Sequence, residues 1–154
     1  MITLGWKSWP EKAAESAEPG PSRRPSYGRY LEDFKPGDVF THPRGLTLHP
    51  ALVQDYATTF MESCPLFLNT SYPQELGFAG QPVPPLMVLA TTLSLGVQNE
   101  SEKAIAHLGY YDVCFPRVTM AGETLRAMTR VLDRKQRGPG EAGIVHVQTL
   151  GLNE

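Results

Sequence analysis

Residues 84–98 predict a helix that is apolar on nearly every side. A helix without a polar face must be buried, because its apolar side chains would otherwise contact water. The helix starts with Pro84 and Pro85, which suit a first turn whose backbone N–H groups have no intrahelical partner. The rest of the chain must therefore fold around this helix.

The pattern after the buried helix changes to that of antiparallel strands. Residues 106–115 predict one strand, and residues 123–135 predict a second one with alternating side chains. Residues 137–143 are rich in Gly and predict a hairpin turn, and residues 144–152 form the returning strand. In the second strand, one face carries Leu125, Ala127, Thr129 and Val131, and the other carries Arg126, Met128 and Arg130. Strands that wrap one long buried helix predict the hotdog fold, an α+β architecture.

The two ends of the chain set the expected domain limits. Residues 1–28 predict a disordered leader, because residues 11–28 are rich in Pro, Ser, Gly, Ala and charge and have little to bury. Residues 29–154 then form the hotdog domain. Residues 151–154 resemble the start of a further hairpin turn, so we expect this domain to lack its last strand.

Between the leader and the buried helix, the sequence predicts a strand, a helix and a loop. The strand is expected at residues 39–40, and an amphipathic helix at residues 46–61, with Pro50 at its first position. Residues 62–83 hold three prolines and two glycines, which predict a long loop with at most a helical turn. Loops of this length inside a small domain are usually functional.

Charge and composition exclude several classes of function. The formal net charge of −2 gives no reason to expect nucleic acid or an anionic membrane as a partner. No apolar run reaches the about 20 residues that a membrane span needs, and no signal peptide is visible, so we expect a cytoplasmic protein. Cys64 and Cys114 have no metal-ligand spacing and predict two free thiols and no metal site.

The histidines form no recognisable catalytic set. His107 and His146 fall in predicted strands, whereas His42 and His49 each precede a proline and predict a loop residue and a helix cap. None of them lies near a Ser or Cys in the sequence in a way that indicates a nucleophilic triad.

Several short motifs, in a characteristic order and spacing, carry a family resemblance that covers most of the chain. They are residues 28–34 (GRYLEDF), 36–37 (PG), 76–78 (LGF), 82–83 (PV), 104–110 (AIAHLGY), 121–125 (AGETL) and 147–153 (VQTLGLN). The chain resembles MaoC-like dehydratases and, more narrowly, the N-terminal half of mesaconyl-CoA (β-methylmalyl-CoA) hydratases. The resemblance implies a hydro-lyase that acts on a short branched or dicarboxylic enoyl-CoA such as mesaconyl-CoA. No cofactor is implied, because the coenzyme A thioester is the substrate.

The catalytic motif of that family, Gly-Asp-x-Asn-Pro-x-His, is altered in this chain. When its Pro is placed on Pro65, Glu62 stands where Asp is expected, Cys64 replaces Asn, and Phe67 replaces His. Hydration of a double bond needs a positioned acid/base pair, and a phenyl ring cannot transfer a proton. Glu62 is the candidate acid/base that remains, although the favoured interpretation is a solvated loop carboxylate.

The start of the buried helix is the second place where the family pattern is changed. In the family, a small residue after the Pro-Val pair offers its backbone N–H to the thioester oxygen, as helix N-termini favour developing negative charge. Here that residue is Pro85, which has no N–H. Leu86 or Met87 is the candidate donor of a shifted oxyanion hole, but the simpler interpretation is that this site no longer binds a reacting carbonyl. The expected substrate-binding residues are Phe67, Pro84, Pro85 and Leu86, together with Tyr110 as a candidate for the acyl tunnel.

These changes leave three hypotheses open. In the first, the chain is itself a hydratase that uses Glu62. In the second, it is a substrate-binding, catalytically degenerate half that pairs with a catalytic hotdog domain or forms a homodimer, or a truncated gene product that only binds acyl-CoA. The third is a hotdog thioesterase, which residues 84–98 disfavour because they hold no carboxylate to activate water.

Overall fold

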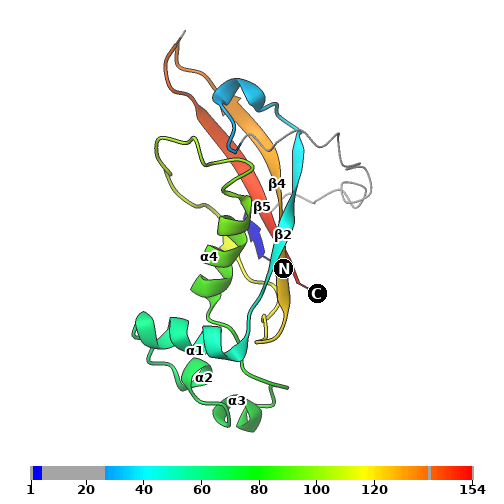
Figure 1. Cartoon of the computed structure of the whole chain (residues 1–154), viewed down its shortest axis with the longest axis vertical. Helices are drawn as coiled ribbons and strands as arrows, with labels where there is room; N and C mark the ends of the chain where they lie inside the picture. The colour runs from blue at the N-terminus through cyan, green and yellow to red at the C-terminus, as the bar shows by residue number, and fades with distance from the viewer. Residues whose placement is uncertain (1, 5–26, 139, 154) are drawn as a thin grey trace.

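The computed structural model describes residues 2–4, 27–138 and 140–153, which form one antiparallel sheet and a set of helices (Figure 1). In chain order the elements are β1 (Ile2–Leu4), the 3₁₀ helix η2 (Leu31–Asp33), β2 (Val39–Thr47), α1 (Pro50–Thr59), α2 (Pro65–Leu68), α3 (Tyr72–Glu75), α4 (Pro85–Gly96), β3 (Val113–Cys114), β4 (Thr124–Lys135) and β5 (Ile144–Asn153). The predicted α+β hotdog arrangement of a central helix against an antiparallel sheet is confirmed.

The sheet has the strand order β2-β4-β5-β1-β3. The hairpin between β4 and β5 is confirmed, because Lys135 pairs with Ile144 at its closed end. The helix α4 lies along one face of the sheet, and the short helices α1, α2 and α3 gather at the end where α4 begins (Figure 1). The start of α4 is therefore the place where the sheet, the central helix and the long loop meet.

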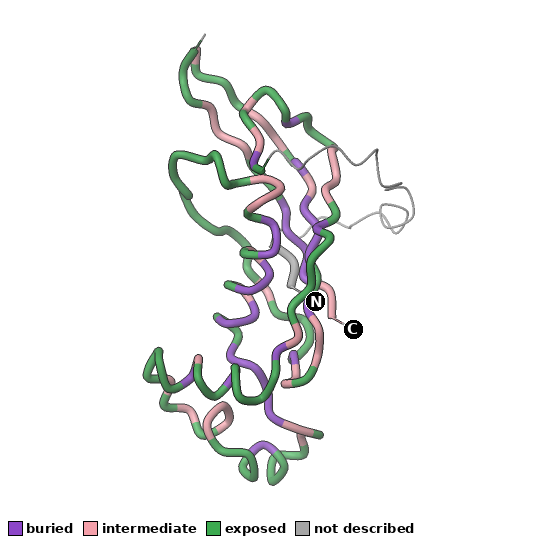
Figure 2. Tube along the Cα trace, viewed as in Figure 1, coloured by how far each residue is buried: buried purple, intermediate pink, exposed green. Residues whose placement is uncertain are grey.

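The hydrophobic core lies between α4 and the sheet. Its buried residues include Met87, Val88 and Leu95 on α4 and Leu125 and Ala127 on β4. Figure 2 shows the buried residues along the inner side of α4 and the facing strands. Burying a side chain of this size contributes about 1.5–3 kcal/mol, so these contacts account for much of the attachment of α4 to the sheet.

The sequence predicted that the central helix is buried on every side, and the structure shows that it is not. Its outward side exposes Leu86, whose side chain is 68% exposed, and also Ala90, Ser94 and Val97. The isolated sheet covers only one face of α4, because a sheet can contact a helix only along the stripe that faces it. The outer face of α4 is left apolar and uncovered by the described residues.

The prediction of a strand over residues 106–115 is wrong for most of that segment. The structure forms only β3, and residues 104–112 are irregular, with Asp112 in the left-handed region at φ 54°. Ile105, at the start of this segment, is 89% exposed. An alternating pattern becomes a strand only where a partner strand accepts its hydrogen bonds, and here the pairing with β1 reaches only Val113 and Cys114.

The strand β2 is longer than predicted, and it takes in residues that were assigned to a loop and a helix. It extends from Val39 to Thr47, so His42 and Pro43 lie in a strand. Because β2 is at the edge of the sheet, Pro43 can occupy it without disrupting a two-sided ladder. The following helix starts at Pro50, as predicted, and ends at Thr59.

Part of the predicted leader belongs to the sheet. Ile2–Leu4 form β1, which lies between β5 and β3. Residues 5–26 lie outside the described residues. Gly28 donates its backbone N–H to the Gln98 carbonyl at 2.6 Å, which joins the last residue of the predicted leader to the turn after α4. Within the described part of the chain, no helix is long and apolar enough to cross a membrane.

Candidate functional site

A cavity of about 240 Å³ lies at the start of α4. Its walls come from α2 and the loop after it, from the first residues of α4, and from the segment between β3 and β4. Most of the lining is apolar and includes Phe67, Phe78, Val83, Pro85, Val88 and Phe115. Two polar residues, Arg117 and Thr119, complete the described lining. The cavity can therefore accept an apolar group with a polar or charged end.

Hydrogen bonds hold the walls of the cavity together. Val83 donates its N–H to the Thr119 carbonyl at 2.9 Å, and Ala121 donates to the Gln81 carbonyl at 2.8 Å. The buried Gln81 side chain also donates to the carbonyl of Phe67 at 2.6 Å. Gln81 thus connects the long loop to the start of α4. The sequence did not predict this role.

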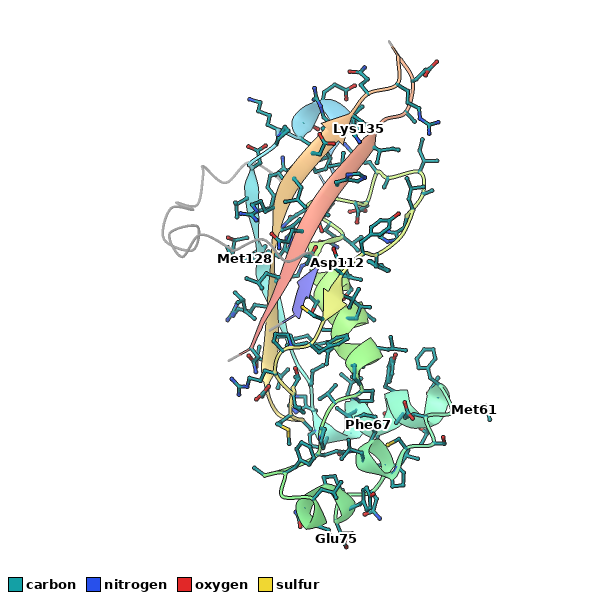
Figure 3. The ribbon with its side chains drawn as sticks, turned by 180° about the vertical axis from the view of Figure 1, so that it is seen from behind. Met61, Phe67, Glu75, Asp112, Met128 and Lys135 are labelled. Atoms are coloured by element: carbon teal, nitrogen blue, oxygen red, sulfur yellow. The ribbon has the colours of Figure 1, made fainter. Side chains whose placement is uncertain are left out.

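Two of the residues predicted to bind substrate lie together in this cavity. Phe67 on α2 and Pro85 at the first position of α4 both line it. Figure 3 shows Phe67 among the side chains between the short helices and α4.

The first turn of α4 has one N–H group available as a donor. The Pro84 carbonyl accepts hydrogen bonds from the N–H groups of Met87, at 2.9 Å, and Val88, at 3.1 Å. The N–H of Leu86 has no partner among the described residues. Pro84 is buried at the N-cap and serves as this internal acceptor. Of the two candidate donors, Leu86 is the one that the fold leaves free.

Glu62 lies in the loop after α1 and does not line the cavity. One of its carboxylate oxygens accepts the backbone N–H of Cys64 at 3.0 Å, and its own N–H binds the Ala57 carbonyl at 2.8 Å. The preceding residue, Met61, adopts φ 54° and is 87% exposed. Met61 stands at the Gly position of the motif, and its left-handed backbone is one that glycine adopts more easily than a residue with a Cβ.

A family model described as mesaconyl-CoA hydratase matches residues 21–154. The chain belongs to the mesaconyl-CoA hydratase family. It is 29% identical over 133 residues to the β-methylmalyl-CoA dehydratase of Chloroflexus aurantiacus, with 86% of this chain and 38% of that relative covered. It is 28% identical over 127 residues to the mesaconyl-CoA hydratase of Cereibacter sphaeroides, with 82% and 37% covered.

Solved structures show the same fold. A MaoC domain protein dehydratase from Chloroflexus aurantiacus has a TM-score of 0.81 at 29% identity, covering 86% of this chain and 38% of that one. A MaoC-like dehydratase from Rhodospirillum rubrum has a TM-score of 0.69 at 25% identity, covering 82% and 87%. This mesaconyl-CoA hydratase family member therefore spans less than two-fifths of the curated relatives named above, and about the length of a single MaoC-like domain.

Tyr110, the last of the predicted site residues, lies away from the cavity. Tyr110 is in the irregular segment before β3, where its ring centroid lies 4.2 Å from that of His107. It is partly exposed and is not among the residues that line the cavity. Across the described residues, no group of three or more His, Cys, Asp or Glu side chains is placed to hold a metal ion.

A buried polar cluster lies at the opposite end of α4, and sequence reasoning missed it. His42 on β2 is within 2.9 Å of the Thr129 hydroxyl and 3.1 Å of the Asn99 amide nitrogen. The pKa of His42 is lowered to about 4, mainly by burial and to a smaller extent by the positive charge of Arg44. Burial raises the pKa of Glu100 in the same region to about 7. The cluster anchors the turn after α4 to the sheet and lies at the far end of α4 from the cavity.

Proposed function

We propose that this chain is an acyl-CoA-binding hotdog domain of a MaoC-type hydratase, with a short branched or dicarboxylic enoyl-CoA such as mesaconyl-CoA as its ligand. Membership of the family supports the type of ligand, since the relatives are named for β-methylmalyl-CoA and mesaconyl-CoA. The observation that carries the binding role is the composition of the cavity. None of the described residues that line it has a carboxyl or imidazole group.

The cavity suits an acyl group at the start of a helix. The apolar walls remove the hydrocarbon part of the acyl group from water, which stabilises the bound state. The free N–H of Leu86 is a donor for the thioester oxygen, in the first turn of α4 where the helix dipole favours negative charge. Phe67 provides contact area in place of acid/base chemistry.

Hydration of the double bond then requires an acid/base pair from outside this cavity. Proton transfer in such a reaction needs a titratable group within hydrogen-bonding distance of the reacting carbon atoms or the attacking water. Glu62 turns its carboxylate to the backbone of Cys64 and does not line the cavity. A separate catalytic hotdog domain supplies the missing pair in this proposal.

Two apolar surfaces favour such a second domain. One is the outer face of α4, with Leu86 and Val97 exposed, and the other is the irregular segment before β3, with Ile105, Leu108 and Tyr111 exposed. This segment leads into β3, which lies at the edge of the described sheet. Exposed apolar surface next to a sheet edge favours association with another domain.

Binding and turnover measured on the same preparation test the proposal. We expect the purified chain to bind mesaconyl-CoA in calorimetry and to leave its enoyl-thioester absorbance unchanged. A MaoC-like dehydratase, such as the Rhodospirillum rubrum protein, is then assayed alone and together with the chain, and hydration by the mixture above that of the added enzyme alone shows that the two domains act together. Absence of binding contradicts the proposal directly.

The alternative, a hydratase that uses Glu62, predicts a different result in this assay. Hydration by the chain alone that is lost in Glu62→Gln and retained in Glu75→Gln would establish the alternative. Glu75 is a suitable control because it is an exposed carboxylate on α3, in the same loop region.

A further inference from the structure

Arg117 is the charged residue among the described residues that line the cavity. It lies in the segment between β3 and β4, two residues before Thr119, whose carbonyl is bound by the N–H of Val83. The backbone that carries Arg117 is therefore held against the start of α4. Its side chain is 65% exposed, so water has access to its contacts.

The present partner of Arg117 is Glu123. A terminal nitrogen of the guanidinium, Nη2, donates to Glu123 Oε1 at 3.1 Å, and this is the one hydrogen bond of the Arg117 side chain within the described residues. A guanidinium has five N–H donors in a planar fork that matches a carboxylate or phosphate. Most of the hydrogen-bonding capacity of Arg117 is thus available to a ligand.

Glu123 does not depend on Arg117. Its other oxygen, Oε2, accepts the side-chain amide of Asn153 at 2.6 Å and the backbone N–H of Met120 at 3.2 Å. The Glu123 side chain is only 18% exposed, whereas that of Arg117 is 65% exposed, so the carboxylate keeps its other two contacts when Arg117 leaves. An exposed ion pair of this kind contributes little to stability, because water and salt screen it. Exchange of Glu123 for a ligand anion is therefore feasible.

We propose that Arg117 is the anion-binding residue of this cavity, and that it exchanges its contact with Glu123 for an anionic group of the bound acyl-CoA. This inference rests on the proposed function and deepens it by assigning the charged end of the ligand. Two groups of an acyl-CoA have the required chemistry: the free carboxylate of a dicarboxylic acyl group and a phosphate of coenzyme A. Both accept the paired N–H donors of an arginine.

Binding measurements with three ligands separate these sources. The ligands are mesaconyl-CoA, which carries a free carboxylate, crotonyl-CoA, which lacks it, and free coenzyme A. We expect Arg117→Gln to weaken binding about tenfold, the effect of losing a charged hydrogen-bonded contact. A loss confined to mesaconyl-CoA assigns Arg117 to the acyl carboxylate, whereas an equal loss for all three ligands assigns it to a phosphate.

Arg137→Gln is the matched control. It removes the same charge from the exposed β4–β5 hairpin turn, outside the cavity lining, and so measures the effect of net charge alone. Arg117→Lys keeps the charge and loses the planar fork, so intermediate binding is expected; it also serves as the second variant if Arg117→Gln does not fold. If the wild type and both Arg117 variants bind every ligand with equal affinity, the role of Arg117 is overturned and the proposed function is not. A wild-type chain that binds none of the three ligands overturns the proposed function and the inference with it.

Discussion

The imidazole of His42 lies 2.9 Å from the hydroxyl of Thr129, across 87 residues of sequence and in the interior of the domain. On its other side, Nδ1 of the ring faces the side-chain nitrogen of Asn99 at 3.1 Å. An amide nitrogen can only donate, so Nδ1 accepts, and in the neutral ring Nε2 carries the proton and donates to Thr129. The lowered pKa of His42 agrees with this neutral form.

Glu100, in the same cluster, makes stability depend on pH. Its pKa is raised from 4.5 to about 7, chiefly by burial, while a hydrogen bond from Thr129 and the charge of Arg29 act in the opposite direction. The folded state therefore holds this proton more tightly than the unfolded state. The stabilising contribution of Glu100 is complete below pH 4.5 and is lost as the pH rises through about 7. We expect Glu100→Gln, which cannot ionise, to gain about 3 kcal/mol in free energy of unfolding relative to the wild type between pH 4.5 and about 7. Urea denaturation at a series of pH values measures the difference, and a constant difference contradicts it.

His42 has the opposite pH dependence. Because its pKa is lowered from 6.5 to about 4, its contribution to stability is complete above pH 6.5 and is lost as the pH falls through about 4. We expect His42→Asn to lower the free energy of unfolding at neutral pH and to remove its decrease at acid pH. The slope of the unfolding free energy between about pH 6.5 and pH 4 is the quantity to compare. A slope identical to that of the wild type would show that His42 does not titrate in this range.

The cluster of His42 and Glu100 leaves no room for a side chain at Gly96. A Cβ added at Gly96 would lie 2.5 Å from Oε1 of Glu100 and 2.9 Å from Nε2 of His42. Gly→Ala in a helix normally stabilises a protein by about 1 kcal/mol, but here the added methyl group displaces a buried polar network. We expect Gly96→Ala to be destabilising by about 1–3 kcal/mol. Thermal unfolding compared with Ser94→Ala, at an exposed position of the same helix, checks the prediction. A Gly96→Ala protein as stable as the wild type contradicts it.

Local patterns predicted the parts of the fold that short-range physics determines. The hairpin between β4 and β5 follows from a glycine-rich turn between two alternating segments, and the start of α1 follows from Pro50. The segment over residues 106–115 has a similar alternating pattern but lacks a partner strand for most of its length. Strand formation there depends on pairing with β1, far away in the sequence, which no local pattern contains.

The site could be predicted only where a motif marked it. Phe67 and Pro85 were found because they replace motif residues, and both line the cavity. Arg117 and the His42 cluster were missed, because their significance depends on contacts between distant segments. His42 was assigned to a loop on account of Pro43, yet an edge strand tolerates proline.

Met61 carries backbone strain at the glycine position of the family motif. Its φ of 54° lies in the left-handed region, which costs a residue with a Cβ about 1–2 kcal/mol. Its side chain projects outward (Figure 3) and has little packing to lose. We expect Met61→Gly to stabilise the domain by about 0.5–1 kcal/mol, after the greater flexibility of glycine in the unfolded chain is subtracted. Met61→Ala, which keeps the strain and shortens the side chain, is the control in chemical denaturation. If the two variants are equally stable, the backbone at Met61 is not strained.

The N–H of Leu86 can be removed without removing the helix. Proline is tolerated in the first turn, where the N–H makes no intrahelical bond, so Leu86→Pro deletes the donor proposed for the thioester oxygen. Leu86→Ala keeps the N–H and removes the exposed side chain, which makes it the matched control. We expect Leu86→Pro to bind mesaconyl-CoA about five- to tenfold more weakly than Leu86→Ala, the effect of one hydrogen bond. Calorimetric titration measures both affinities, and circular dichroism confirms that α4 is retained. Equal affinities in two folded variants would mean that the thioester oxygen is bound elsewhere.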